Sequence, residues 1–415
     1  MPELSEAVMG IIQRVRDAGD QALLEMTELF DSTVLKSIRV SEQEIAAAKE
    51  KLNAEQLNAL KAAARNLRRF HEAQLPAPLT VNITGGVSCE RVWRPIDVIG
   101  LYVPAGTAPL PSTALMLGVP AAVAGCDTKV LCTPPRADGT ADPSVLVAAE
   151  LCGVTEIFKV GGAQAVAAMA YGTASVPKVA KIFGPGNNWV TLAKQQVSID
   201  PDGAALDMPA GPSEVLVIAD AEADPKFVAA DLLSQAEHGT DSQVMLVATS
   251  EAFAEAVNTE LRRQLKSLPR AETAAAALEN GCTLLVSDVA RAVEISNRYA
   301  PEHLILQVRG AREYLAAVKN AGSVFLGSWT PEAIGDYCSG TNHVLPTNGY
   351  ARALSGLSVE AFMKQVFVQE SSPEGLSEIG PIAETLARLE GLDAHARAVS
   401  LRLQVEEGAT HERRA

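Results

Sequence analysis

A glutamine, a glutamate and a histidine lie within four consecutive positions in Gln235-Ala236-Glu237-His238. The residues before them predict a helix over 224–237 that ends here. Zn²⁺ prefers histidine, cysteine and carboxylate ligands, so residue type alone favours Glu237 with His238. Spacing favours Gln235 instead, because residues three apart share one face of a helix. The alternative is a polar helix end without a ligand, where the helix dipole favours a protonated histidine.

A second candidate pair, Glu302-His303, stands between Pro301 and the apolar run that starts at Leu304. The run predicts a strand over residues 304–307, with the two titratable side chains at its edge and on opposite faces. A histidine there could abstract an alcohol proton near neutral pH. The glutamate could activate water or orient its neighbour. Without a chemical role, the segment would be a helix terminus broken by Pro301.

Two further polar residues, Asp336 and His343, fall in a loop rich in glycine, serine and threonine that follows a predicted strand. Loops at the carboxyl ends of parallel strands are where α/β enzymes bind their ligands. The same composition is also typical of turns whose side chains cap backbone groups. His395 is isolated on a predicted helix, which on its own indicates a surface residue. We expect His71 and His411 to be solvated.

Size and charge limit the kinds of partner. The chain has 415 residues, more than one hydrophobic core usually supports, and its net charge is −15. We expect no nucleic acid and no anionic membrane as partner, because an acidic surface repels both. Residues 98–126 carry no charge, but four prolines interrupt them, which argues against a membrane-spanning helix. Residues 98–126 instead predict a buried strand, a ligand-facing loop and a buried helix.

Six cysteines are present and no pair has C-x-x-C spacing. This pattern indicates reduced thiols in the cytoplasm, and the first residues show no secretory signal.

Short apolar runs alternate with helical segments after a helical stretch of about 75 residues. Strands are expected at 129–133, 157–160 and 181–183, and again at 214–218, 243–248, 282–286, 304–307 and 323–325. The alternation predicts parallel sheets covered by helices, and its two blocks predict two α/β domains. After about Leu357 the chain is predicted to be helical, as an arm that dimerises or packs on its own chain.

No G-x-G-x-x-G sequence follows any of these strands, and no Walker A sequence is present. The nearest glycine-rich turn is Gly184-Pro185-Gly186-Asn187, and such a turn is more often structural. A nucleotide bound by this chain would therefore be held without the usual glycine fingerprint.

Taken together, these segments resemble the histidinol dehydrogenase family over nearly the whole chain. The resemblance is carried by residues 100–106, 160–165, 183–187, 207–214, 234–238, 301–304 and 339–347. It implies the oxidation of L-histidinol to L-histidine through the aldehyde, in the final steps of histidine biosynthesis. The implied cofactors are two NAD⁺ and one Zn²⁺ per subunit, and the implied assembly is a homodimer with shared active sites.

The resemblance also implies roles for individual residues. The zinc ligands would be Gln235, His238, Asp336 and, from the partner subunit, His395, which selects Gln235 over Glu237. Glu302 and His303 match the catalytic acid/base pair. Substrate contacts would come from Ser213, His343 and Glu390, together with His303 and the metal ligands. NAD contacts would come from Tyr102, Gln164 and Asn187.

The expected fold is therefore α/β, with two Rossmann-like parallel-sheet domains that lack the glycine fingerprint and a helical C-terminal dimerisation arm. Residues 1–105 and 214–357 would form a discontinuous domain with the metal and catalytic residues. Residues 106–213 would form an inserted domain with the NAD contacts, and residues 358–415 the arm.

Four alternatives remain at this point. Relatives that oxidise another alcohol, such as sulfopropanediol, are disfavoured by Glu390 and by the run at 342–347. A zinc hydrolase could use Glu302 as general base. A thiol mechanism could use Cys126 or Cys152, but their apolar surroundings indicate inert packing. A non-catalytic binding protein is least compatible, because every candidate position carries a chemically competent residue.

Overall fold

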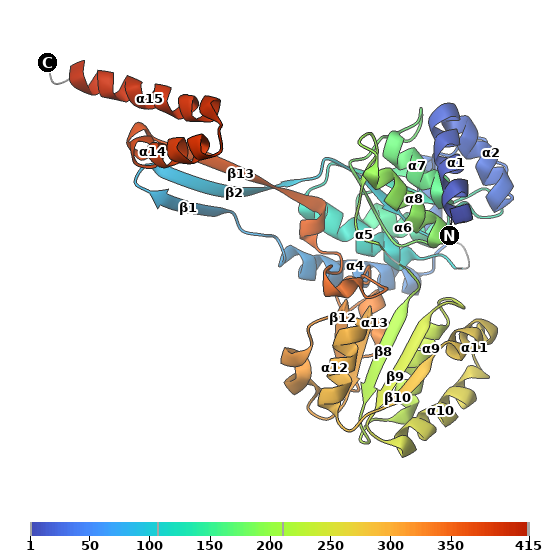
Figure 1. Cartoon of the computed structure of the whole chain (residues 1–415). Coiled ribbons are helices and arrows are strands. Elements are labelled where there is room, and N and C mark those ends of the chain that lie inside the picture. Colours follow the sequence, from blue (N-terminus) through green and yellow to red (C-terminus); the bar gives the residue numbers. More distant parts are fainter. Residues whose placement is uncertain (1, 106–107, 210, 413–415) are drawn as a thin grey trace. The chain divides into compact units, whose positions relative to one another are not determined.

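The computed structural model describes residues 2–105, 108–209 and 211–412, which divide into two units (Figure 1). The first unit comprises Met1–Leu75 and Ile96–Phe362. The second comprises Pro76–Pro95 and Met363–Ala415. The first unit holds two parallel sheets, and the second holds an antiparallel sheet with two helices.

The first parallel sheet has the order β5-β4-β3-β6-β7. Its strands are β3 (Val98–Tyr102), β4 (Thr128–Thr133), β5 (Glu156–Lys159), β6 (Lys181–Phe183) and β7 (Ala205–Leu206). The helices of this part are α5 (Pro111–Ala124), α6 (Pro143–Leu151), α7 (Gly162–Tyr171) and α8 (Asn188–Ile199). The strand order reverses between β3 and β6, and open α/β sheets bind ligands outside the carboxyl ends of strands at such a point.

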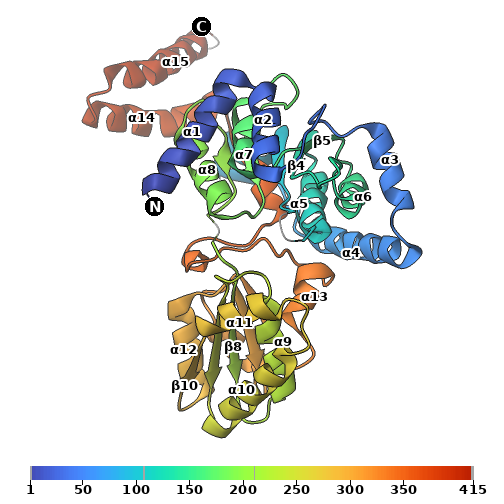
Figure 2. The same cartoon turned by 90° about the vertical axis from the view of Figure 1, so that its right-hand side faces the viewer.

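Four N-terminal helices pack on this first sheet domain. They are α1 (Pro2–Ala18), α2 (Asp20–Asp31), α3 (Glu42–Glu50) and α4 (Ala54–Glu72). Figure 2 shows α1 and α2 beside α7, and α3 and α4 beside α5 and α6, as their contacts require. Val8, Ile12 and Val15 of α1 belong to the same buried cluster as Val166 of α7. The predicted grouping of residues 1–105 with 214–357 therefore differs from the structure, which places these helices and β3 with the first sheet.

The second parallel sheet repeats the same order as β10-β9-β8-β11-β12. Its strands are β8 (Glu214–Ala219), β9 (Gln243–Ala248), β10 (Cys282–Leu285), β11 (His303–Gln307) and β12 (Ser323–Leu326). The connecting segments include α9 (Pro225–Ala236), α10 (Glu251–Leu265), α11 (Ala271–Glu279), α12 (Val289–Tyr299), η1 (Ala311–Ala317) and α13 (Glu332–Tyr337). Val215 and Ile305 face one buried cluster, whereas Leu216 and Leu304 face the other, so helices cover both faces.

The second unit begins with strands that the sequence patterns did not predict. β1 (Leu79–Thr84), β2 (Val87–Pro95) and β13 (Met363–Ser371) form an antiparallel sheet in the order β1-β2-β13. The short helices η2 (Tyr350–Arg352) and η3 (Val359–Phe362) precede β13, and α14 (Pro373–Leu389) and α15 (Asp393–Glu412) follow it. The helical tail is thus confirmed from Pro373 onward, but residues 363–371 are a strand.

The predicted pair of parallel α/β sheets with a helical C-terminal region is confirmed. Within the described ranges, no helix combines the length and the apolar character needed to cross a membrane.

Candidate active site

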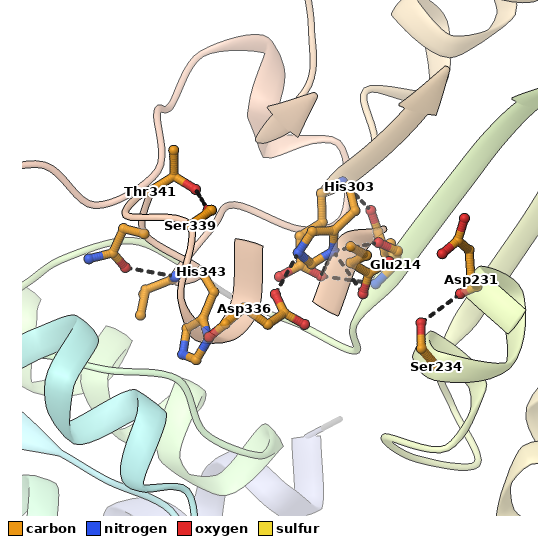
Figure 3. Close-up of polar contacts among 12 residues, drawn as sticks. Glu214, Asp231, Ser234, His303, Asp336, Ser339, Thr341 and His343 are labelled. Carbon is orange, nitrogen blue, oxygen red and sulfur yellow. Dashed lines mark hydrogen bonds and ion pairs between the residues drawn. The ribbon is translucent and has the colours of Figure 1, made fainter. Parts of the chain in front are cut away.

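His303 opens β11 between β8 and β12, and it is almost fully buried. Its Nδ1 lies 3.0 Å from the carbonyl oxygen of Glu214. A carbonyl oxygen only accepts, so Nδ1 carries the proton, and in the neutral ring Nε2 keeps its lone pair. Nε2 is buried without a hydrogen-bond partner in the described part of the chain, and it faces Oδ1 of Asp336 at 3.6 Å (Figure 3). The ring is therefore oriented as a base.

Three carboxylates control the protonation of His303. Burial opposes a charged imidazole, but Glu332, Glu302 and Asp336 outweigh it and raise the pKa of His303 well above its ordinary value. The nearest oxygens of Glu302 and Glu332 lie 3.7 and 3.8 Å from Nδ1. His303 is thus a stronger proton acceptor than a free histidine.

Glu302 and Glu214 hold each other in place through their backbones. Oε2 of Glu302 accepts the N–H of Glu214 at 2.9 Å, and Oε2 of Glu214 accepts the N–H of Glu302 at 3.4 Å. Burial raises the pKa of Glu302 to about 7. The expectation that Glu302 and His303 point to opposite faces was wrong. Glu302 precedes β11, so the alternation of side chains along a strand does not apply to it, and its carboxylate lies beside the His303 ring.

The short helix α13 supplies two acids one turn apart, Glu332 and Asp336, both facing His303. Asp336 was expected in a loop, but it lies in this helix. Glu332 is 1% exposed, and burial raises its pKa to about 8. For Asp336, burial also acts to raise the pKa, but His303, His343 and His238 hold it below its usual value, as a carboxylate. Sequence reasoning missed Glu332, and only its spacing of four from Asp336 could have indicated it.

The last turn of α9 and the residue after its C-cap carry the other candidate ligands. Gln235 is fully buried, and neither its amide nitrogen nor its oxygen has a partner among the described residues. α9 ends at Ala236 with Glu237 as C-cap, and His238 follows. His238 is an exposed residue, yet desolvation of its ring by the surrounding protein lowers its pKa against the opposing charges of Asp336 and Glu237. A neutral imidazole is the form that binds a metal, whereas a histidine that only served the helix dipole would be protonated.

Two sets of side chains could therefore hold a metal ion. One atom from each of His303, Glu332 and Asp336 lies within 4.8 Å of the others. The predicted set shares Asp336 with this group and adds Gln235 and His238. An amide buried without partners is costly unless a group outside the chain satisfies it, so Gln235 fits a metal ligand.

A sequence profile described as histidinol dehydrogenase matches residues 1–403. The chain belongs to the histidinol dehydrogenase family. The histidinol dehydrogenase of Vibrio parahaemolyticus serotype O3:K6 is 57% identical over 401 residues, which cover 97% of this chain and 92% of the relative. That of Xanthomonas campestris pv. campestris strain 8004 is 59% identical over 400 residues, with 96% and 93% covered. The predicted family resemblance is confirmed.

Solved structures agree with this assignment. The crystal structure of histidinol dehydrogenase from Elizabethkingia anophelis has a TM-score of 0.95 and 46% identity, and covers 97% of this chain and 93% of its own. An apo indole-3-acetaldehyde dehydrogenase aligns with a TM-score of 0.50 and 15% identity, covering 89% of this chain and 88% of its own. That second likeness shows a shared fold only.

The remaining substrate candidates divide between the two units of this family member. Ser213 directly precedes Glu214 at the start of β8. His343 is half-buried, its Nδ1 donates to the carbonyl of Asp336 at 2.9 Å, and its Nε2 lies 3.4 Å from Oγ1 of Thr113. Glu390, the C-cap of α14, and His395, on α15, belong to the second unit, and both are exposed.

The NAD candidates follow strand ends of the first sheet. Tyr102 ends β3, and its buried hydroxyl accepts the N–H of Gly162 at 3.1 Å. Gln164 is buried on α7, which follows β5. Asn187 follows β6 and caps α8, where its Oδ1 accepts the N–H groups of Trp189 and Val190. All three lie at carboxyl ends of parallel strands, but the cofactor contacts themselves remain a prediction.

The two candidate thiols, Cys126 and Cys152, are packed in the interior, as expected from the sequence. Cys126 and Cys152 are buried, and burial raises their pKa to about 11 and about 12 respectively. Neither thiol would form a thiolate near neutral pH.

Proposed function

We propose that this chain oxidises L-histidinol to L-histidine through L-histidinaldehyde, using two NAD⁺ and one Zn²⁺ per subunit in the final steps of histidine biosynthesis. The observation that carries the proposal is the geometry of His303, whose Nδ1 donates to the carbonyl oxygen of Glu214 and whose buried Nε2 has no hydrogen-bond partner among the described residues, so it is the nitrogen available to the substrate. Similarity to proteins named histidinol dehydrogenase over nearly the full chain supports the choice of substrate.

The zinc would be held by Gln235, His238, Asp336 and His395 of the partner subunit. Three observations support this set: the buried amide of Gln235 has no other described partner, His238 is held neutral, and Asp336 is held as a carboxylate. When bound, the ion would orient the imidazole and amine nitrogens of histidinol, both of which are good zinc donors.

The residues of the chain then divide the proton transfers. His303 accepts the alcohol proton at Nε2 as hydride passes to NAD⁺. Glu302, with a pKa of about 7, takes a proton from the water that adds to the aldehyde carbonyl. After releasing the alcohol proton to solvent, His303 takes the proton of the resulting hydrate during the second hydride transfer. Ser213 and His343 contact the substrate, and Glu390 opposes its cationic or N–H end. Retaining the aldehyde in a closed site protects a reactive intermediate.

The second unit exposes large apolar side chains, which support the proposal of a homodimer. Large apolar side chains on β1, β13 and α14 are exposed: Leu79, Val81, Ile83, Val366, Phe367, Val368, Ile382, Leu386 and Leu389. Exposed patches of this kind usually mark an interface. We propose that a second copy of the chain covers them, and that His395 of each arm completes the zinc site of the partner.

The direct test is a spectrophotometric assay with L-histidinol and NAD⁺, in the cytoplasmic pH range expected for this enzyme. We expect two NADH per histidinol, loss of activity with a chelator, and recovery on adding Zn²⁺. Sulfopropanediol serves as the competing substrate. Absence of NADH with histidinol would contradict the proposal, and turnover of sulfopropanediol instead would move the chain to another activity within the family.

Zinc content should separate the two possible metal sets. Gln235→Ala removes a proposed ligand and should reduce bound zinc from one per subunit toward none. Glu332→Gln keeps the shape of a buried side chain that belongs only to the other set, so zinc should stay bound. Metal analysis after dialysis measures both. The reverse result would place the ion at His303, Glu332 and Asp336.

Mixed dimers test whether the site is shared. Gln235→Ala and His395→Ala chains should each be inactive alone, because every site lacks one ligand. Refolded together, half of the dimers contain one intact site, so about a quarter of wild-type activity should return. A mixture that stays inactive while forming dimers would show that His395 acts within its own chain or not at all.

A further inference from the structure

The turn after β6 lies where the first sheet reverses its strand order. Gly184 leaves β6 with φ +122°, and a Cβ at this position would lie 2.2 Å from the carbonyl oxygen of Tyr102 at the end of β3. The chain therefore passes so close to β3 that only glycine fits. Asn187, which ends this turn, was singled out by the family resemblance as an NAD contact.

A buried ion pair holds both polar backbone atoms of Gly184. Lys194 on α8 donates from Nζ to the carbonyl oxygen of Gly184 at 2.9 Å and to Oδ1 of Asp207. Oδ2 of Asp207 accepts the N–H of Gly184 at 2.8 Å, and its Oδ1 accepts the N–H of Met208 at 2.7 Å. The side chains of Lys194 and Asp207 are 5% and 1% exposed. The backbone of the turn at Gly184 is thus hydrogen-bonded to two buried side chains and not to solvent.

This arrangement is not needed for packing alone. A buried ion pair can often be replaced by apolar residues of similar volume without loss of stability, because desolvation offsets the attraction. What apolar residues cannot replace is the set of hydrogen bonds to Gly184. The Lys194–Asp207 pair therefore determines the backbone conformation of the turn at Gly184 more than it adds to the stability of the fold.

The start of α8 shows why that shape matters for a dinucleotide. Oδ1 of Asn187 already accepts the N–H groups of Trp189 and Val190, which in a usual Rossmann fold would face a phosphate. This leaves the Nδ2 group of Asn187 as the side-chain donor at the turn. A contact made by one side chain on a short turn depends on where the backbone holds it.

We propose that Lys194 and Asp207 are positioning residues for NAD⁺: their buried ion pair fixes Gly184 and thereby places Asn187 at the crevice between β3 and β6. The proposal rests on the proposed function, which supplies the dinucleotide. It assigns the two residues no contact with the cofactor.

The test uses the full-length enzyme with Lys194→Met and Asp207→Leu together, which removes both charges of the buried pair at once. Amide hydrogen exchange at Gly184 should become faster by about tenfold or more, as expected for losing its acceptor. KM for NAD⁺ should rise by about tenfold or more, because even a small displacement of Asn187 would weaken its contact with the dinucleotide. kcat at saturating NAD⁺, KM for histidinol and zinc content should change little. A general loss of structure would not produce this split.

Two further variants complete the design. Lys159→Met with Glu44→Leu removes another partly buried pair, 3.4 Å apart, which has no described contact with the turn. It should leave exchange at Gly184 and KM for NAD⁺ unchanged. Lys194→Gln together with Asp207→Asn removes both charges but keeps polar side chains of similar shape, and it serves if the first double variant does not fold. It should shift both quantities in the same direction by less.

Unchanged exchange at Gly184 in a folded variant, or a fall in kcat without a rise in KM for NAD⁺, would overturn the inference. If the wild-type enzyme reduces no NAD⁺ with histidinol, the proposed function fails instead. Exchange at Gly184 then still decides whether the ion pair holds the turn.

Discussion

Replacing His303 with asparagine should lower kcat for both oxidations by about 10²–10⁴-fold, the usual contribution of a general base. The asparagine amide can occupy the position of Nδ1 and still donate to the carbonyl oxygen of Glu214, so the backbone geometry is kept. What it lacks is the equivalent of Nε2, which the proposed mechanism uses in both steps. Single-turnover measurements of NADH formation, starting from histidinol and from histidinaldehyde, check each step separately.

The pH dependence should change in the same variant. The wild-type kcat/KM should rise with pH, because only the unprotonated His303 is a base and its neighbouring carboxylates raise its pKa. The asparagine side chain of the variant does not titrate, so the residual rate should be flat over this range. His71→Asn is the matched control. The expectation that His71 is solvated was wrong, because the structure buries it, and like His303 it donates from Nδ1 to a carbonyl, that of Leu67 at 2.8 Å. Equal losses in the two variants would contradict a catalytic role for His303.

The parts of the fold that the sequence revealed are those with strong local patterns. Apart from the two-residue strand β7, which was missed, the strands of both parallel sheets are short apolar runs between helical segments, so their positions follow from alternation alone. β13 was missed because all but its first residue are exposed, and no buried face imposes a pattern on them. The grouping of the N-terminal helices was missed for another reason. It depends on contacts between α1 and α7, which are far apart in the chain.

The site residues likewise divide into those that a local sequence pattern revealed and one that only distant contacts bring into place. Gln235 and His238 were singled out because they lie three positions apart at the predicted end of a helix, and Glu302 and His303 because two titratable groups adjoin a predicted strand. The structure ends α9 at Ala236, so His238 lies just beyond the helix. Glu332 looks in the sequence like an ordinary acid in the first turn of a helix, where the dipole favours a negative charge. Its proximity to His303 arises only when α13 packs beside β11. Burial of a charged residue by distant segments has no local signal.

Glu302→Gln should slow the oxidation of the aldehyde by about 10²-fold or more and largely spare the oxidation of the alcohol. Glutamine retains an oxygen that can accept the N–H of Glu214, so His303 and its surroundings should stay in place. It cannot take a proton from water, which the proposed second step requires. The expected result is a first NADH formed at nearly the normal rate and a second formed slowly. Rapid-mixing absorbance, with chemical trapping of histidinaldehyde, measures both.

Glu214→Gln gives the contrast that makes this result specific. The carboxylate of Glu214 accepts the N–H groups of Glu302 and Asn348, and glutamine can accept only with its single oxygen. Losing one of these bonds disturbs the segment that carries both Glu302 and His303, so Glu214→Gln should slow the two oxidations to a similar extent. A uniform loss in Glu302→Gln as well would mean that Glu302 only positions His303. A loss confined to the aldehyde step identifies Glu302 as the group that activates water.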